Sequence, residues 1–162
     1  MNNKLKIILV LACVSVVWAV QNDKSDISKE QQTAIEQEIL NVHREIVKAA
    51  ENSDADVLFH YVLDKCKGVI VQDGRIMMTR KESLDTTKQG LEGLKDVSYT
   101  FNRKNITLIS PTVALWVADG TTSVTTVDEQ QFTVDFAETI VFVKKYGQWK
   151  IFHAHRSMPN PR

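Results

Sequence analysis

The chain has 162 residues, of which 43% are hydrophobic and 25% charged, and its 20 basic side chains balance its 20 acidic ones. This length and composition are typical of a single globular domain with one core. The balanced charge argues against nucleic acid as a partner, because proteins that bind nucleic acid carry an excess of basic residues.

The first 19 residues differ in character from the rest. Lys4 and Lys6 precede an apolar run over residues 7–18, and Ala19 ends a stretch suited to cleavage. This pattern is typical of a secretory signal peptide. An uncleaved anchor fits less well, since the run is shorter than the roughly 20 residues that span a bilayer. We therefore expect an exported protein, periplasmic or secreted, with residues 20–28 as a polar linker.

A second processing site is Val10-Leu11-Ala12-Cys13, which is similar to the cleavage box of bacterial lipoproteins. Cleavage there would leave the protein lipid-anchored through Cys13, and the sequence leaves the choice open. After cleavage near Ala19, Cys66 is the remaining cysteine, so no intrachain disulfide can form.

Helices are predicted first along the chain. Residues 30–52 carry apolar side chains at spacings of three and four, typical of an amphipathic helix. Asp54 is suited to be the N-cap of a second, short helix. Asp73-Gly74 predicts a tight hairpin turn within KGVIVQDGRIMM, and Thr79-x-x-Glu82 predicts a capping box that begins a third helix, ending near Gly90.

Strands follow the helices. Alternating and β-branched residues predict four long strands over about 95–109, 112–127, 131–144 and 148–157. Helices followed by antiparallel strands are the α+β order. We expect one domain over residues 29–160, built on a strongly curved sheet that the helices cover on one side.

This order of elements, together with AETIVFVKKYGQWKIFHAHRSMPNP at residues 137–161, resembles the nuclear transport factor 2-like superfamily. Within it, the run is similar to SnoaL-like exported bacterial domains and to the association domain of calcium/calmodulin-dependent kinase II. The resemblance covers about residues 30–160. It implies a cone, in which a curved antiparallel sheet wraps three N-terminal helices, with a pocket on the concave face and often a dimer interface on the outer face.

The resemblance also implies that Arg156 points into the pocket. Alternation along residues 148–157 then puts Phe152 on the concave face as well. The same alternation puts Trp149, His153 and His155 on the outer face, where we expect a homodimer interface.

A tight turn at residues 145–148 predicts that Glu138 lies opposite His155 on the outer face. It puts Asp135 on the concave face, diagonal to Arg156. A one-residue bulge would shift this register.

The candidate pocket would combine Arg156 and Asp135 with an aromatic lining of Tyr61, Phe101, Trp116 and Phe152. Arg156 either pairs with an acid of the protein or recognises an anionic ligand such as a carboxylate. Two histidines at alternate positions can share a metal ion, but no further ligand is near in sequence. We therefore expect no metal and no cofactor.

Asp73 is the candidate catalytic residue. The resemblance to ketosteroid isomerases within the superfamily implies a general base at this position. A carboxylate in an apolar pocket can take a proton from carbon beside a carbonyl. The second acid and the phenol of those enzymes have no counterpart here.

Three functions remain open from the sequence. The first is an exported, non-catalytic domain that binds a small organic molecule. The second is a cyclase, isomerase or dehydratase that uses Asp73 as base. The third is a homo-oligomerisation module whose pocket is vestigial.

Overall fold

The structure, a computed structural model, describes residues 27–64 and 67–159. The predicted cleavage sites at Ala19 and Cys13, and also Cys66, lie outside the described residues.

The three predicted helices are present, and each begins at a capping side chain. In α2 (Lys29–Glu51), Ser28 and Gln31 form a reciprocal capping box. In α3 (Ala55–His60), the Asp54 side chain accepts from the Val57 amide. In α4 (Arg80–Leu91), Thr79 accepts from the Glu82 amide, but the Glu82 carboxylate accepts from Met78 rather than from Thr79. The caps satisfy amides that helices leave free at their first turn.

The predicted strands are also present. A short hairpin joins β1 (Ile70–Gln72) to β2 (Arg75–Met77). Four long strands follow, β3 (Leu94–Ser110), β4 (Val113–Thr126), β5 (Gln131–Lys145) and β6 (Gln148–Ser157). They form one sheet in the order β2-β1-β6-β5-β4-β3, in which β1 runs parallel to β6 and the other neighbouring strands pair antiparallel. The sheet is therefore mixed.

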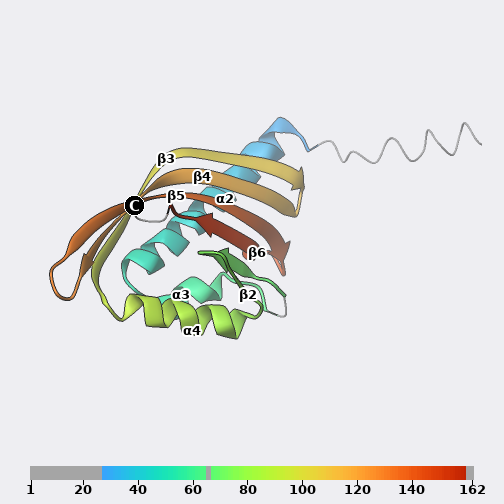
Figure 1. The fold of residues 1–162 in the computed structure, drawn as a ribbon. Helices are drawn as coiled ribbons and strands as arrows, with labels where there is room; N and C mark the ends of the chain where they lie inside the picture. Colours follow the sequence, from blue (N-terminus) through green and yellow to red (C-terminus); the bar gives the residue numbers. More distant parts are fainter. Residues whose placement is uncertain (1–26, 65–66, 160–162) are drawn as a thin grey trace, which may run out of the picture.

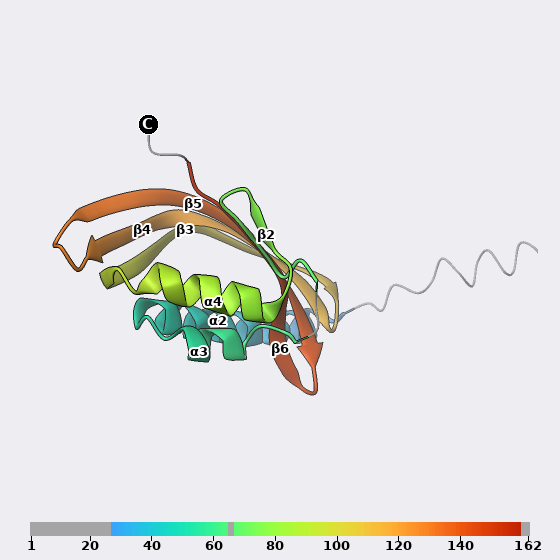
Figure 2. The same ribbon diagram turned by 60° about the horizontal axis from the view of Figure 1, so that its bottom comes forward.

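The sheet curves strongly around the helices. Figure 1 shows α2 crossing one face of the sheet, with α3 and α4 below it, and Figure 2 shows the strands arching over all three helices. Register shifts in the β3–β4 and β5–β6 pairs mark where the strands bend. At one of them Gly120 is required, because a Cβ there would lie 2.0 Å from the Thr100 carbonyl oxygen.

The core lies between the concave face of the sheet and the helices. Ile39 of α2 and Phe59 of α3 meet Trp116 and Phe142 of the sheet, and none of the four is exposed. The α+β cone that the sequence predicted is the observed fold.

Candidate functional site

A cavity of about 720 Å³ lies between the helices and the concave face of the sheet. Its floor is formed by buried side chains, His43, Phe59, Glu138, Ile140 and Ile151. Its exposed lining residues, among them Asp73, Arg75, Ile76 and Thr86, come from the β1–β2 hairpin and α4. The mouth of the cavity is therefore between that hairpin and α4.

An ion pair lies at the floor. Arg156 of β6 stands opposite Glu138 of β5, and its Nη2 donates to Glu138 Oε2 at 2.7 Å. The Glu138 side chain is 4% exposed and that of Arg156 is 28% exposed. The guanidinium also lies over the rings of Tyr99 and Phe136, at 5.2 and 4.9 Å from their centroids. Arg156 is thus held by a carboxylate and two aromatic faces.

The other oxygen of the same carboxylate holds a histidine. His43 of α2 lies with Nε2 at 3.2 Å from Glu138 Oε1, which also accepts from Trp116 Nε1 at 3.0 Å. The His43 ring stacks on Trp116 with centroids 3.9 Å apart and meets the edge of Phe101. These contacts fix the plane of the imidazole ring.

Glu138 is ionised in this setting. Burial raises the pKa of its carboxyl, but the hydrogen bond with His43 and the charge and hydrogen bond of Arg156 outweigh that effect and lower the pKa to about 2. For Arg156, burial lowers the pKa, and the opposing effects of Glu138 and Tyr99 give a net rise. Glu138 and Arg156 therefore both remain charged, and the net charge of the pair is zero.

A bulge in β6 changes which of its residues face the cavity. Val141 pairs with His153 but Phe142 pairs with Ile151, so Phe152 is an extra residue. Arg156, after the bulge, lines the cavity. Before the bulge the faces are reversed, and the predictions for Trp149 and Phe152 were wrong.

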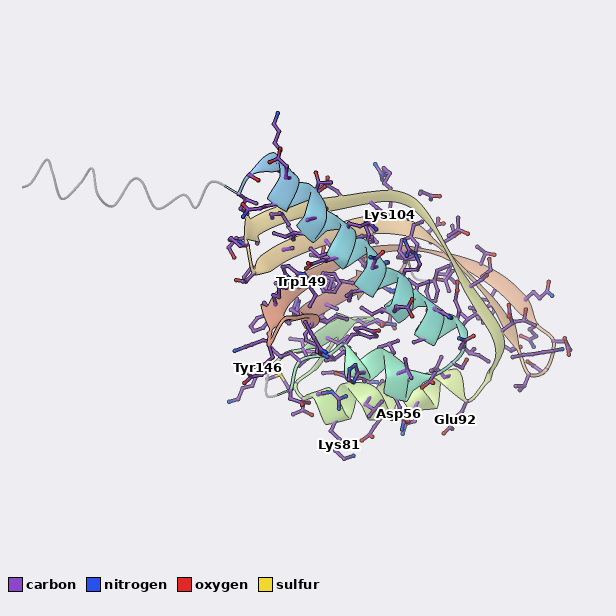
Figure 3. The ribbon with its side chains drawn as sticks, turned by 180° about the vertical axis from the view of Figure 1, so that it is seen from behind. Asp56, Lys81, Glu92, Lys104, Tyr146 and Trp149 are labelled. Carbon is purple, nitrogen blue, oxygen red and sulfur yellow. The ribbon has the colours of Figure 1, made fainter. Side chains whose placement is uncertain are left out.

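Trp149 is 3% exposed and donates through Nε1 to Glu38 of α2, so it lies in the core (Figure 3). Phe152 is 47% exposed and is not part of the cavity wall. Strict alternation fails here because two consecutive residues, Phe152 and His153, lie between the inward-facing Ile151 and Ala154.

The bulge also reverses the prediction for β5. Glu138 was expected on the outer face opposite His155, but it faces Arg156 inside, and His155 pairs with Thr139. Asp135 was expected beside Arg156, but it is exposed and lies outside the cavity. The acid that partners Arg156 is therefore Glu138.

Three aromatic residues predicted to line the pocket do not form its wall. Trp116 and Phe101 lie one layer behind, where they pack against His43. Tyr61 lies outside the cavity wall, with Lys150 Nζ 5.9 Å from its ring centroid. Trp116 and Phe101 support the site rather than line it.

Asp73 does lie at the mouth of the cavity, but not in an apolar setting. It occupies the hairpin turn with φ 52°, is exposed, and accepts from the Gln72 side chain at 3.2 Å. Its surroundings therefore lack the apolar enclosure that the prediction of a general base assumed.

The strand histidines lie away from the floor. His153 is half-buried with Nδ1 at 2.8 Å from the Gly68 carbonyl oxygen, and His155 is exposed near the mouth. Over residues 27–64 and 67–159, no three His, Cys, Asp or Glu side chains gather as metal ligands. In the same part of the chain, no helix is long and apolar enough to cross a bilayer.

His43 and Tyr99 are site residues that the sequence analysis did not single out. A signal for His43 was available, since it falls four residues after Ile39 and three before Ile46, on the buried stripe of α2. A histidine on such a stripe needs a polar partner inside the fold.

The fold is similar to that of nuclear transport factor 2-like proteins. A protein from Salmonella enterica described by that superfamily name superposes with a TM-score of 0.71 at 13% identity, over 80% of this chain and 94% of that one. A protein from Xanthomonas campestris, provisionally assigned as a calcium/calmodulin-dependent protein kinase II association domain, gives 0.68 at 16% identity, over 77% and 88%. A hexachlorocyclohexane dehydrochlorinase from Novosphingobium barchaimii gives 0.69 at 13% identity, over 81% and 90%.

At these identities the similarities establish the fold alone. No curated protein sequence matches the chain significantly. The family model of the SnoaL-like domain matches residues 39–161. The chain belongs to the SnoaL-like domain family.

Proposed function

We propose that this domain binds a small organic molecule in the cavity, and that the part of the molecule next to Arg156 is polar but uncharged. The volume of about 720 Å³ is within the range of small-molecule sites. Apolar side chains such as Ile46, Val47 and Leu58 line the walls, and the buried polar side chains of the cavity, His43 and Glu138, lie at the floor.

The main support for the proposal is the hydrogen bonding of Arg156 and Glu138 at the floor of the cavity. Among the described residues, the guanidinium of Arg156 makes one hydrogen bond, to Glu138, and no buried polar side-chain atom there lacks a partner. Arg156 lines the cavity, so we take its remaining N–H groups to be available to a ligand there. They can donate to a ligand, while Glu138 already balances the charge.

This balance favours a carbonyl or another neutral acceptor over a carboxylate. A carboxylate would have to compete with Glu138 for the guanidinium, and the two anions would repel each other. Among the similar structures is a dehydrochlorinase, an enzyme, which supports the view that this fold accommodates small organic molecules. A catalytic role for Asp73 has less support, because its carboxylate is exposed.

The test is to purify the full chain under native conditions, denature it, and identify any released compound by mass spectrometry. Ala154→Phe fills the cavity, and Ala137→Phe is the matched control on an exposed position of the neighbouring strand. We expect the wild type and the control to release the same compound, and Ala154→Phe to release none. Retention by Ala154→Phe would overturn the proposal. So would a wild type that releases nothing and has an unchanged melting temperature with cyclohexanone, acetophenone and 2-tetralone.

A second candidate function is homo-oligomerisation through the outer face of the sheet. Val117 and Phe152 are 42% and 47% exposed there, beside half-buried Leu115 and Val141. An apolar face of this kind is typical of a subunit interface. Binding and dimerisation use opposite faces of the sheet and can coexist.

We further propose that the protein is exported, with cleavage near Ala19 and a lipid on Cys13 as the alternative. The basic and apolar pattern of residues 1–19 supports this. The intact mass of the full chain recovered from a Gram-negative bacterial host distinguishes a start at residue 20 from a lipid-modified Cys13. An unprocessed Met1 would contradict both.

A further inference from the structure

We propose that His43 is a general base that removes a proton from the bound molecule, next to a carbonyl group held by Arg156. The domain would then convert its ligand rather than only bind it. This inference rests on the proposed binding function and adds a reaction at the same site.

The hydrogen-bond partners of His43 fix which ring nitrogen can act. Glu138 is an ionised acceptor, so Nε2 of His43 carries the hydrogen in the contact with Oε1. In the neutral ring, Nδ1 then has the free electron pair. Within the part of the chain that the structure describes, Nδ1 makes no hydrogen bond. No fully buried polar side-chain atom lacks a partner in that part of the chain, so Nδ1 is not fully buried. His43 lines the cavity, and we infer that Nδ1 is accessible from it.

The surroundings of the ring suit a base rather than a purely structural histidine. Trp116 stacks against one face and Phe101 meets it edge-on, so the ring cannot turn away from the floor. When Nδ1 gains a proton, the imidazolium lies 3.2 Å from the Glu138 carboxylate, which stabilises the new charge. Glu138 is therefore a positioning residue.

Arg156 completes the arrangement. It is bonded to the second oxygen of the same carboxylate, so the base and the guanidinium are neighbours at the cavity floor. An oxygen that becomes negative when the neighbouring carbon loses a proton would be stabilised by the free N–H groups of Arg156.

The step is balanced within the site. His43 Nδ1 takes the proton from the carbon beside the carbonyl, and the C–H electron pair forms an enolate whose oxygen accepts from Arg156. His43 then returns the proton to the same carbon, or to the far end of a conjugated system, which gives an isomer. No external oxidant, reductant or cofactor is consumed.

The experiment follows deuterium incorporation into 2-tetralone in D₂O by NMR, with binding measured separately from the chemical shifts of the protein. We expect the wild type to accelerate exchange and His43→Gln to lose about a hundredfold or more of that rate while still binding. Glutamine keeps an N–H for Glu138 but has no basic nitrogen. The control is His60→Gln, the same change at an exposed position of α3, which should keep the wild-type rate.

A second measurement reads the state of the ring itself. In the neutral ring, the ¹⁵N shifts of His43 should report the hydrogen on Nε2, and a hydrogen on Nδ1 instead would overturn the inference. Binding of 2-tetralone without accelerated exchange would overturn the inference and leave the binding function intact. Failure of 2-tetralone, cyclohexanone and acetophenone all to bind would count against the binding function, and the inference would fall with it.

Discussion

Glu138 of β5 and Arg156 of β6 stand directly opposite each other on the concave face of the sheet, joined by a 2.7 Å hydrogen bond at the floor of the cavity. The same carboxylate accepts from Trp116 and contacts His43. One acidic side chain therefore organises the polar groups of the site.

Replacing Glu138 should destabilise the protein strongly. In Glu138→Ala the guanidinium of Arg156 loses its partner in a mostly buried position, and breaking a buried ion pair costs about 3–5 kcal/mol. Urea unfolding measures this loss. The same change at exposed Glu45 of α2 is the control and should alter the free energy of unfolding by less than about 0.5 kcal/mol. A loss at Glu138 no larger than the control would contradict the structure of the site.

Stability should fall in acid because of Glu138. The pKa of Glu138 is lowered from 4.5, the value expected in the unfolded chain, to about 2 in the folded protein. The contribution of Glu138 to the free energy of unfolding is therefore fully present above pH 4.5 and is lost as the pH falls toward 2. The size of this contribution is about 3 kcal/mol, from the difference between the two pKa values. Urea midpoints between pH 2 and 6 measure it, and they should depend less on pH in Glu138→Gln than in the wild type. Equal pH dependence in both proteins would show that other groups dominate.

Gly120 should not tolerate a side chain. A Cβ there would lie 2.0 Å from the Thr100 carbonyl oxygen, so Gly120→Ala forces β3 and β4 apart and should cost about 1–3 kcal/mol or more. Gly90→Ala is the matched control, since its Cβ would meet open space within α4. That change should stabilise the protein by about 0.5–1 kcal/mol through helix propensity. Thermal unfolding of the two variants should therefore shift in opposite directions.

The outer face of the sheet should control the oligomeric state. Val117→Lys introduces a charge into the apolar outer face and should convert a dimer into a monomer, measured by size-exclusion chromatography with light scattering. Val57→Lys, at a 48% exposed position of α3, is the control and should leave the dimer intact. A monomeric wild type would remove the dimer proposal.

The sequence by itself determined the helices, the hairpin, the four long strands and their α+β order. Caps such as Asp54 before α3 and Thr79 before α4, and the Asp73-Gly74 turn, act over a few residues, so they can be read from local sequence. The residues around Arg156 near the C-terminus also predicted the fold through their family resemblance.

Only the tertiary structure decided which side chains form the site. The bulge at Phe152 reverses the faces of β6 before it and moves Glu138, in place of Asp135, beside Arg156. A bulge depends on how a whole strand bends against its neighbours and the helices, and two-residue alternation carries no information about it. The contact between His43 and Glu138, 95 residues apart, likewise exists only because α2 packs against the concave face of the sheet.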